Sequence, residues 1–364
     1  MKIKDIKYSI ISIPFNYSIQ HARKSFSSTE SVIIELHIDE YVGIGECCPR
    51  EYVGGVSLNQ AVNLLKELKK KLKGLRINSS KELLKISDKK LGKYPHLKAA
   101  FDIAFVDIYC KIKEMYLYEY LGGIKRKCIK YDAGVPLTSS EDTLNYVKRF
   151  YNHGVKRFKL KADKDIDNLE KKVKMIKDNY PDVEIKIDAN SSWDITTLKK
   201  ASNKLGKCEI LLIEDPIDIK KYKVEEIKKI KKDVSIPLMA DESLITYEDA
   251  KNFVENEIFE WFNLKLSKNG GIHSLLDIYT LANKSGVLLQ FGAHYGECGI
   301  IESVRRQIGC CKLSFKFFEG ANRILLTDDI VKEDLKLKDN LVADLSYIST
   351  YGLGINLKET IKWN

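Results

Sequence analysis

The segment EIKIDANSSW (184–193) contains an apolar run that ends on an aspartate, Asp188. The same arrangement recurs along the middle of the chain and gives the series Lys161, Asp188, Glu214, Asp241 and Lys265. Neighbouring members of this series are 27, 26, 27 and 24 residues apart. A strand, a turn, a helix and a return loop take roughly 25–30 residues, which is the size of a βαβ repeat. We therefore expect one functional side chain at the C-terminal end of each of five successive parallel strands.

After about residue 127 the sequence alternates regularly between predicted strands and helices, as in an α/β barrel. Eight apolar runs, separated by lysine-rich helical stretches, begin at Ile129, Val155, Val183, Ile210, Ile236, Trp261, Val287 and Leu313. Eight alternations are what closure of a (β/α)8 TIM-type barrel requires, and the C-terminal strand ends then surround one mouth where active sites are built. We expect the barrel over residues 127–333, with strand 7 at Val287–Ala293 and strand 8 at Leu313–Glu319.

The first part of the chain reads differently, as strands followed by helices. The expected elements are strands at Ile3–Ile13, Ser31–Ile38 and Tyr41–Glu46 and helices at Leu58–Leu72, Lys81–Ile86 and His96–Tyr109. This order is typical of an α+β unit, and we place an N-terminal capping domain at residues 1–126. Its polar segments 16–28 and 48–57 are predicted to be irregular, and long irregular segments in a compact domain are often lids or binding loops. Residues 334–364 no longer follow the strand–helix alternation of the barrel, and we expect them to pack back on the cap.

Charge and cysteine usage narrow the class of protein. The net charge of +10 comes from 61 Lys and Arg against 51 Asp and Glu, and the excess lysine is spread over helical stretches. This spread is typical of solvated helix faces, so we expect no nucleic-acid partner. The N-terminal residues mix charged with apolar residues, and no apolar run is long enough for a membrane span, so no membrane partner is expected. Eight cysteines without a CxxC motif fit a reducing compartment, and a cytoplasmic location is expected.

The three acids of the series suggest a metal site. Asp188, Glu214 and Asp241 would repel one another at one barrel mouth unless a cation neutralised them. Ligands that are all oxygen favour Mg²⁺, or Mn²⁺, over zinc. Each acid taken alone could equally be an ordinary strand-end residue that caps a helix. Three acids at matching strand ends, with lysines on both sides, favour the metal.

The lysines suggest acid–base chemistry. Lys159 and Lys161 alternate on one strand and so point to the same face. Lys161 on strand 2 and Lys265 on strand 6 would face each other across a metal-bound substrate. One lysine can then remove a proton α to a carboxylate, and the other can return a proton from the opposite face or stabilise charge during elimination or addition. Lys159 would lower the pKa of Lys161. A solvated strand end in a lysine-rich protein is the alternative reading of this Lys-x-Lys pair.

These motifs, in this order, resemble the enolase superfamily. The matching pieces are FKLKAD (158–163), KIDANSSW (186–193), IEDP (213–216), MADES (239–243) and NLKLSKNGGI (263–272). The resemblance is closest to the muconate-lactonizing subgroup, which is mandelate racemase and muconate cycloisomerase-like. It implies Mg²⁺ on Asp188, Glu214 and Asp241, with Lys161 and Lys265 as the acid–base pair. It also implies Lys159 as an electrostatic helper, cap loops that close over the substrate, and a homo-oligomer.

The substrate contacts are less well defined. Relatives that epimerise dipeptides carry Asp-x-Asp on the last strand for the substrate ammonium, whereas SFKFFEG (314–320) has a single acid, Glu319. The end of strand 7, QFGAHYGECG (290–299), does not match the versions seen in o-succinylbenzoate synthases or muconate enzymes. An arginine in the cap loops could clamp a second carboxylate or could be an ordinary surface residue. The candidate contacts are Asn190, Glu319, His294, Glu297, His21, Arg23, Arg50 and Tyr52.

Taken together, the sequence predicts a Mg²⁺-dependent isomerase whose partner is a small-molecule carboxylate. The reaction would be epimerisation, racemisation or cycloisomerisation of a dipeptide, an amino-acid derivative or a muconate-like diacid. One alternative is a lyase resembling o-succinylbenzoate synthase, in which one lysine is the base and the other stabilises a dienolate through a cation–π contact. Another alternative is a non-catalytic barrel that acts as a binding protein.

Overall fold

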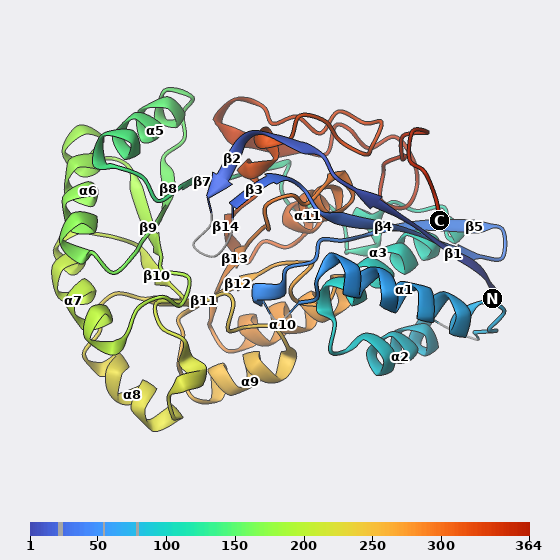
Figure 1. Ribbon diagram of the computed structural model, residues 1–364, viewed down its shortest axis with the longest axis horizontal. Coiled ribbons are helices and arrows are strands. Elements are labelled where there is room, and N and C mark those ends of the chain that lie inside the picture. The colour runs from blue at the N-terminus through green and yellow to red at the C-terminus, as the bar shows by residue number, and fades with distance from the viewer. Residues whose placement is uncertain (21–24, 54, 78–79) are drawn as a thin grey trace.

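The computed structural model describes residues 1–20, 25–53, 55–77 and 80–364. Figure 1 shows an N-terminal part, in blue to cyan, beside a barrel whose green to yellow helices lie on the side away from it. The N-terminal sheet has the order β1 (Ile3–Ile11), β4 (Ser31–Ile38) and β5 (Tyr41–Cys47), all antiparallel. It is followed by α1 (Leu58–Leu72), α2 (Ser80–Leu91) and α3 (Pro95–Ile112). The predicted α+β order of this part is therefore observed.

Sheet and helix of this N-terminal part pack unusually closely. A Cβ added to Gly45 on β5 would lie 1.9 Å from the carbonyl oxygen of Ala100 on α3, and one added to Gly43 would lie equally close to that of Ala104. Only glycine lets two backbones approach to this extent. The tight packing fixes α3, which carries several residues that contact the barrel.

Eight parallel strands form the barrel, as the sequence predicts. They are β7 (Ala133–Val135), β8 (Arg157–Lys161), β9 (Glu184–Asp188), β10 (Leu212–Glu214), β11 (Leu238–Ala240), β12 (Trp261–Leu264), β13 (Leu288–Phe291) and β14 (Phe315–Phe318), paired in this order. The backbone N–H of Asp132, just before β7, donates to the carbonyl of Phe318 on β14 at 2.9 Å, so the two edge strands meet. Closure of the sheet brings all C-terminal strand ends to one mouth.

Helices connect successive barrel strands. They are α5 (Ser140–Asn152), α6 (Ile166–Asn179), α7 (Ile195–Leu205), α8 (Val224–Lys232), α9 (Tyr247–Glu255), α10 (Ile272–Lys284) and α11 (Gly299–Cys311). Their apolar faces are buried on the sheet and their lysines lie outward, which explains the lysine-rich stretches of the sequence. After β14, where every residue is described, the chain forms the short turns η4 (Ala321–Leu325) and η5 (Asp339–Leu341) instead of an eighth α-helix.

Three expected boundaries differ from the structure. The run from Ile129 is not the first barrel strand: it forms β6 (Cys128–Lys130), which pairs antiparallel with β15 (Val342–Asp344), and β7 follows after a short break. Strands 7 and 8 of the barrel are shorter than predicted. An apolar run shows that a segment is buried, but it does not show which strand will pair with that segment.

The segment 16–28 was also predicted wrongly to be irregular. Its described residues belong to a hairpin of β2 (Pro14–Gln20) and β3 (Ser25–Ser28). Pairing of the two strands gives hydrogen-bond partners to backbone N–H and C=O groups, and the sequence alone does not show these partners. The base of the hairpin is tied to the chain after β14, because the N–H of Thr327 donates to the carbonyl of Pro14 at 3.1 Å. The hairpin base therefore lies beside the segment that follows the last barrel strand.

The C-terminal residues return to the N-terminal part. The N–H of Asn364 donates to the carbonyl of Tyr8 on β1 at 2.9 Å, and the N–H of Leu353 donates to Asp107 Oδ1 on α3 at 3.0 Å. Near them, the N–H of Leu117, which begins α4 (Leu117–Tyr120), donates to the carbonyl of Gly352 at 2.9 Å. Among the described helices, none has the length and apolar character needed to cross a bilayer.

Candidate active site

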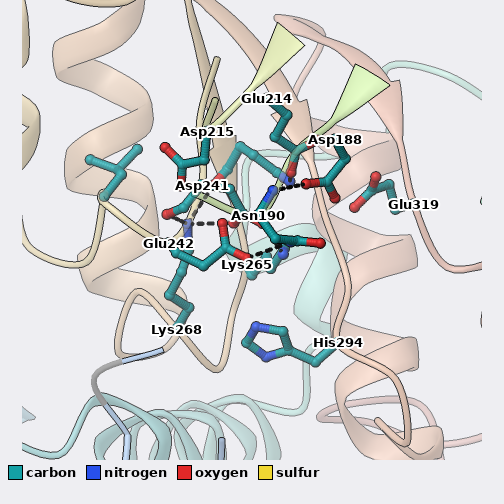
Figure 2. Close-up of polar contacts among 12 residues, drawn as sticks. Asp188, Asn190, Glu214, Asp215, Asp241, Glu242, Lys265, Lys268, His294 and Glu319 are labelled. Carbon is teal, nitrogen blue, oxygen red and sulfur yellow. Dashed lines mark hydrogen bonds and ion pairs between the residues drawn. The ribbon is translucent and has the colours of Figure 1, made fainter. Parts of the chain in front are cut away.

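The five residues of the recurring series meet at the barrel mouth. Lys161, Asp188 and Glu214 end β8, β9 and β10 in matching register, while Asp241 and Lys265 follow β11 and β12 directly. All but Glu214 line one pocket, whose empty volume is about 750 Å³ with open solvent included. Asp188, Glu214 and Asp241 are at most 1% exposed. The convergence predicted from the spacing is present in the structure (Figure 2).

Lys159 lies at the centre of the acids. Its Nζ is 3.1 Å from Glu214 Oε2, 3.3 Å from Asp188 Oδ2 and 2.5 Å from Glu319 Oε1. Burial opposes the charge of Lys159, but the surrounding carboxylates, first Glu214 and then Glu319, outweigh burial and hold its pKa well above the ordinary value. Burial and the neighbouring acids raise the pKa of Glu214 to about 8 even though Lys159 pulls it down.

Lys161 contacts the first of the three acids. Its Nζ lies 2.7 Å from Asp188 Oδ2 and 2.6 Å from Asn190 Oδ1. Burial and Lys159 both lower the pKa of Lys161, as the sequence predicts for Lys159, but Asp188 outweighs them and the net shift is upward. Lys161 is therefore a protonated ammonium beside the Asp188 carboxylate.

Lys265 makes the equivalent contact on the other side. Its Nζ is 2.5 Å from Asp241 Oδ2, and Asp241 outweighs burial, so the pKa of Lys265 is raised. Asp241 has a second cation, because Lys268 Nζ lies 2.9 Å from its Oδ1 and also donates to its backbone carbonyl at 2.6 Å. The pKa of Asp241 is held well below its usual range because these lysines outweigh its burial.

Several residues of the site were not singled out from the sequence. Lys268 looked like one lysine among many, although it lies three residues after Lys265. Asn263 Nδ2 donates to Glu214 Oε1 at 2.8 Å, and its position two residues before Lys265 on one strand was an available signal. Asp132 and Lys186 form a buried ion pair of 2.6 Å, with Asp132 at the pocket wall. Val53, Gly134, Glu242, Tyr295 and Ala321 also line the pocket.

The predicted substrate contacts divide into three groups. Asn190, Glu319 and His294 line the pocket, and Asn190 Nδ2 also donates to Glu242 Oε1 at 2.7 Å. His21 and Arg23 lie outside the described residues, as does the side chain of Tyr52. Glu297 and Arg50 form a third group, whose predicted contact with substrate stays a prediction.

Both residues of that third group are engaged elsewhere. Buried Glu297 accepts a hydrogen bond from Ser267 Oγ at 2.5 Å and pairs with Arg305. The guanidinium of Arg50 donates to the carbonyl of Pro49 at 2.6 Å and to that of Tyr295. Neither is among the described residues that line the pocket. Arg50 therefore joins the cap loop to the barrel.

The donor set at the mouth fits a hard divalent cation. The three buried carboxylates offer only oxygen, from three adjacent strands, and their charges are compensated by lysine ammonium groups. Within the described part of the chain, no three His, Cys, Asp or Glu side chains already converge on one point for a metal. Lys159 Nζ contacts two of the three acids, at 3.3 Å from Asp188 Oδ2 and 3.1 Å from Glu214 Oε2.

Comparisons with known proteins agree with this architecture. The mandelate racemase/muconate lactonizing enzyme N-terminal domain matches residues 7–122, and the enolase C-terminal domain-like family matches residues 142–361. An L-Ala-D/L-Glu epimerase of Clostridium acetobutylicum is 30% identical over 98% of this chain and 99% of its own length. An L-amino acid-D/L-Glu epimerase of Sulfurimonas denitrificans is 28% identical over 78% of this chain and 82% of its own.

Solved structures show the same fold. A dipeptide epimerase from Cytophaga hutchinsonii, complexed with Mg and the dipeptide D-Ala-L-Val, has a TM-score of 0.90 at 22% identity and covers 100% of this chain and 99% of its own. An N-succinyl Arg/Lys racemase from Bacillus cereus has a TM-score of 0.89 at 24% identity, with 99% and 96% covered. Both domains match, in order, and the Clostridium acetobutylicum relative aligns with nearly the whole chain. This chain belongs to the mandelate racemase/muconate lactonizing family of the enolase superfamily.

Proposed function

We propose that this protein is an isomerase that epimerises a small carboxylic acid by moving the proton on its α-carbon. The observation that carries the proposal is the placement of Lys161 at the end of β8 and of Lys265 directly after β12, four strands apart in an eight-stranded barrel, on the wall of one pocket. Four strands apart is half of the ring, so the two ammonium groups approach a bound molecule from opposite sides. The names of the relatives, which are epimerases and racemases, support the same reaction class.

Asp188, Glu214 and Asp241 would hold Mg²⁺ in this proposal. When bound, Mg²⁺ supplies positive charge that acidifies the α-proton of a carboxylate and offsets the pull of the three acids on the lysine pKa values. Mg²⁺ complexes of structural neighbours support this cation over others.

The lysines then perform the proton transfer. The lysine that is neutral takes the α-proton, and the electrons of the broken C–H bond remain on the substrate as its enolate. The opposite lysine, as ammonium, gives a proton to the other face of the same carbon, which inverts its configuration. Because the two lysines exchange roles between the two epimers, the reaction runs in both directions. Asn190 Oδ1 accepts a hydrogen bond from Lys161 at 2.6 Å and so orients its Nζ.

Proton NMR in D₂O tests this proposal directly. The experiment follows the α-proton signals of a panel of dipeptides, N-acyl amino acids and N-methylated amino acids in the presence of enzyme and Mg²⁺. At least one class should lose its α-proton signal and gain the other epimer, and EDTA should stop both changes. Exchange that continues after exhaustive EDTA treatment would contradict the metal site. Absence of exchange with the whole panel, while Mg²⁺ binds, would contradict the proposed substrate range.

A further inference from the structure

A short chain of hydrogen bonds runs from Lys161 to an acid that has no part in the proposed reaction so far. Lys161 Nζ donates to Asn190 Oδ1 at 2.6 Å, and Asn190 Nδ2 donates to Glu242 Oε1 at 2.7 Å. Asn190 lies two residues after β9 and Glu242 two residues after β11, so the chain spans strands that are not neighbours. Both residues line the reaction pocket (Figure 2). The amide of Asn190 therefore contacts the lysine at one end and the acid at the other.

The backbone around Asn190 holds this amide in place. Asn190 has a φ of 45° and Ser191 a φ of 56°, both in the left-handed region that is uncommon for residues other than glycine. The N–H of Asn190 donates to Asp188 Oδ1 at 3.0 Å, and the N–H of Ser191 donates to the carbonyl of Asp215 at 2.6 Å. Strained backbone of this kind persists only where its surroundings hold it, and it collects at functional sites. The turn fixes where the amide lies, but not which of its ends faces Lys161.

Glu242 determines which end of the amide faces the lysine. A carboxylate accepts hydrogen bonds and has no donor, whereas an amide has an acceptor at one end and donors at the other. Turning the Asn190 amide over would place its Oδ1 against the carboxylate of Glu242 and would lose the 2.7 Å hydrogen bond. A glutamine at position 242 could accept or donate and would impose neither orientation. The acid therefore keeps Asn190 Oδ1 towards Lys161.

This orientation matters when Lys161 acts as the base. A neutral amine has two N–H donors and one lone pair, and the lone pair must face the proton that it removes. With Asn190 Oδ1 towards it, the amine donates an N–H to the amide and its lone pair stays free. With the amide reversed, Nδ2 would donate to that lone pair and block it. As an ammonium, Lys161 has donors only and selects Oδ1 without help, so its role as the acid does not depend on Glu242.

The environment of Glu242 argues against a role in packing alone. Its Oε2 is buried and, among the described residues, has no hydrogen-bond partner. A buried carboxylate oxygen without a partner is unfavourable. Glutamine would keep the volume and the contact with Asn190 without burying charge. The property that glutamine lacks is the inability to donate, and this property is what fixes the amide.

We propose that Glu242 is a positioning residue for the proton transfer, which fixes the amide of Asn190 so that the lone pair of Lys161 stays directed at the α-proton of the substrate. Glu242 makes no contact with the reacting atoms, and its role rests on the proposed function, in the direction where Lys161 is the base. Lys265, the base in the other direction, is held by a different partner, Asp241. Loss of Glu242 therefore slows proton removal from one epimer and spares the other.

Exchange rates of the two epimers test this role. In D₂O with saturating Mg²⁺, proton NMR follows the initial loss of the α-proton from the L,L and L,D forms of a dipeptide, or from both forms of another panel compound that exchanges. Lys161→Ala identifies the epimer from which Lys161 takes the proton, because only that epimer should lose exchange. We expect Glu242→Gln to lower kcat/KM for this epimer by at least about tenfold, a part of the 10²–10⁴ that a positioned base contributes, and for the other by less than about twofold. The ratio of the two rates does not depend on how much of a variant folds.

A double-mutant cycle separates positioning from the charge of Glu242. Asn190→Ala alone should shift the ratio in the same direction, because Lys161 loses its oriented acceptor. Glu242→Gln added to Asn190→Ala should change the ratio by less than about twofold, because no amide is left for the acid to orient. Glu248→Gln, at an exposed glutamate in the first turn of α9, should retain the wild-type ratio.

The other outcomes separate the positioning role from the function on which it rests. An unchanged ratio in Glu242→Gln or in Asn190→Ala, or equal slowing of both epimers, would overturn the positioning role and leave the proposed epimerase standing. A shift of full size that persists in the Asn190→Ala background would mean that Glu242 acts on Lys161 through its charge. A shift against the epimer that Lys265 deprotonates would also contradict the role. No exchange by the wild type with any compound of the panel would overturn the proposed function and the role of Glu242 together.

Discussion

Two buried charge clusters in this molecule differ in character. The mouth cluster consists of Lys159, Lys161, Lys265 and Lys268 with Asp188, Glu214, Asp241 and Glu319. The α11 cluster consists of Glu297, Glu302, Arg305 and Arg306, all at most 5% exposed. The first lines an open pocket, whereas the second is enclosed between α11 and its neighbours. The difference lies in the cation, which is lysine at the mouth and arginine on α11.

The type of cation explains what each cluster can do. In the α11 cluster Arg305 Nη1 lies 2.5 Å from Glu302 Oε2 and Arg306 Nε 2.7 Å from Oε1, so the guanidinium forks satisfy the carboxylate. These arginines outweigh burial and lower the pKa of Glu302. Arginine stays charged, so this arrangement is fixed. Lysine can lose its proton when its partners change, so only the mouth cluster can exchange protons with a ligand.

The largest expected effect follows from removing a lysine at the mouth. We expect Lys265→Ala to lower the rate of α-proton exchange by at least about a thousandfold for one epimer, because general acid–base groups contribute on the order of 10²–10⁴. The fold should persist, since Asp241 keeps Lys268 as its partner. Exchange is measured by NMR and folding by circular dichroism. Lys148→Ala on the exposed side of α5 is the control, and full exchange in the double variant Lys161→Ala/Lys265→Ala would exclude both lysines as bases.

An equally buried cation on α11 should affect stability instead. Arg305→Met leaves Glu297 and Glu302 short of a partner, and removing one partner of a buried ion pair costs about 3–5 kcal/mol. We expect the free energy of unfolding in urea to fall by this amount, with kcat per folded molecule retained. Arg149→Met on exposed α5 should change stability by less than about 0.5 kcal/mol. An Arg305→Met protein that is stable but inactive would contradict a purely structural role for the α11 cluster.

A neutral neighbour of the mouth cluster should have a smaller effect. Asn263→Leu removes the 2.8 Å hydrogen bond to Glu214 Oε1 without changing charge. Losing an outer partner of a metal ligand lowers metal affinity by about 10–100-fold. We expect a weaker Kd for Mg²⁺ by isothermal titration calorimetry at unchanged stoichiometry. Unaltered Mg²⁺ affinity in this variant would argue against Glu214 as a ligand.

The sequence predicted the mouth cluster better than the α11 cluster, for a physical reason. Lys161, Asp188, Glu214, Asp241 and Lys265 could be brought together because the βαβ repeat fixes their spacing along the chain. Nothing local shows that Glu297 pairs with Arg305, because that contact depends on how α11 packs. The same limit made the run at Ile129 look like a barrel strand, whereas its partner is β15, more than two hundred residues later.

The smallest expected effect comes from a partly exposed pair between cap and barrel. His273 Nδ1 on α10 lies 2.6 Å from Asp102 Oδ1 on α3, with the histidine side chain 32% exposed. Burial lowers the pKa of His273, but the Asp102 hydrogen bond and charge outweigh it, so the pKa is raised. The stability from this pair is therefore fully present below the unfolded pKa of about 6.5 and is lost as pH rises through the folded value.

Comparison of wild type with His273→Gln across pH measures this contribution. We expect the variant to be less stable by about 1 kcal/mol at pH 6, after allowance for solvent screening, and the difference to shrink steadily towards pH 9. Urea unfolding at each pH gives the two free energies. A difference that grows with pH would mean that His273 is neutral in the folded protein. Because Asp102 and His273 come from different parts of the fold, their pair also reports on the attachment of the cap. Loss of this pair should leave the lysine–carboxylate contacts at the mouth unchanged.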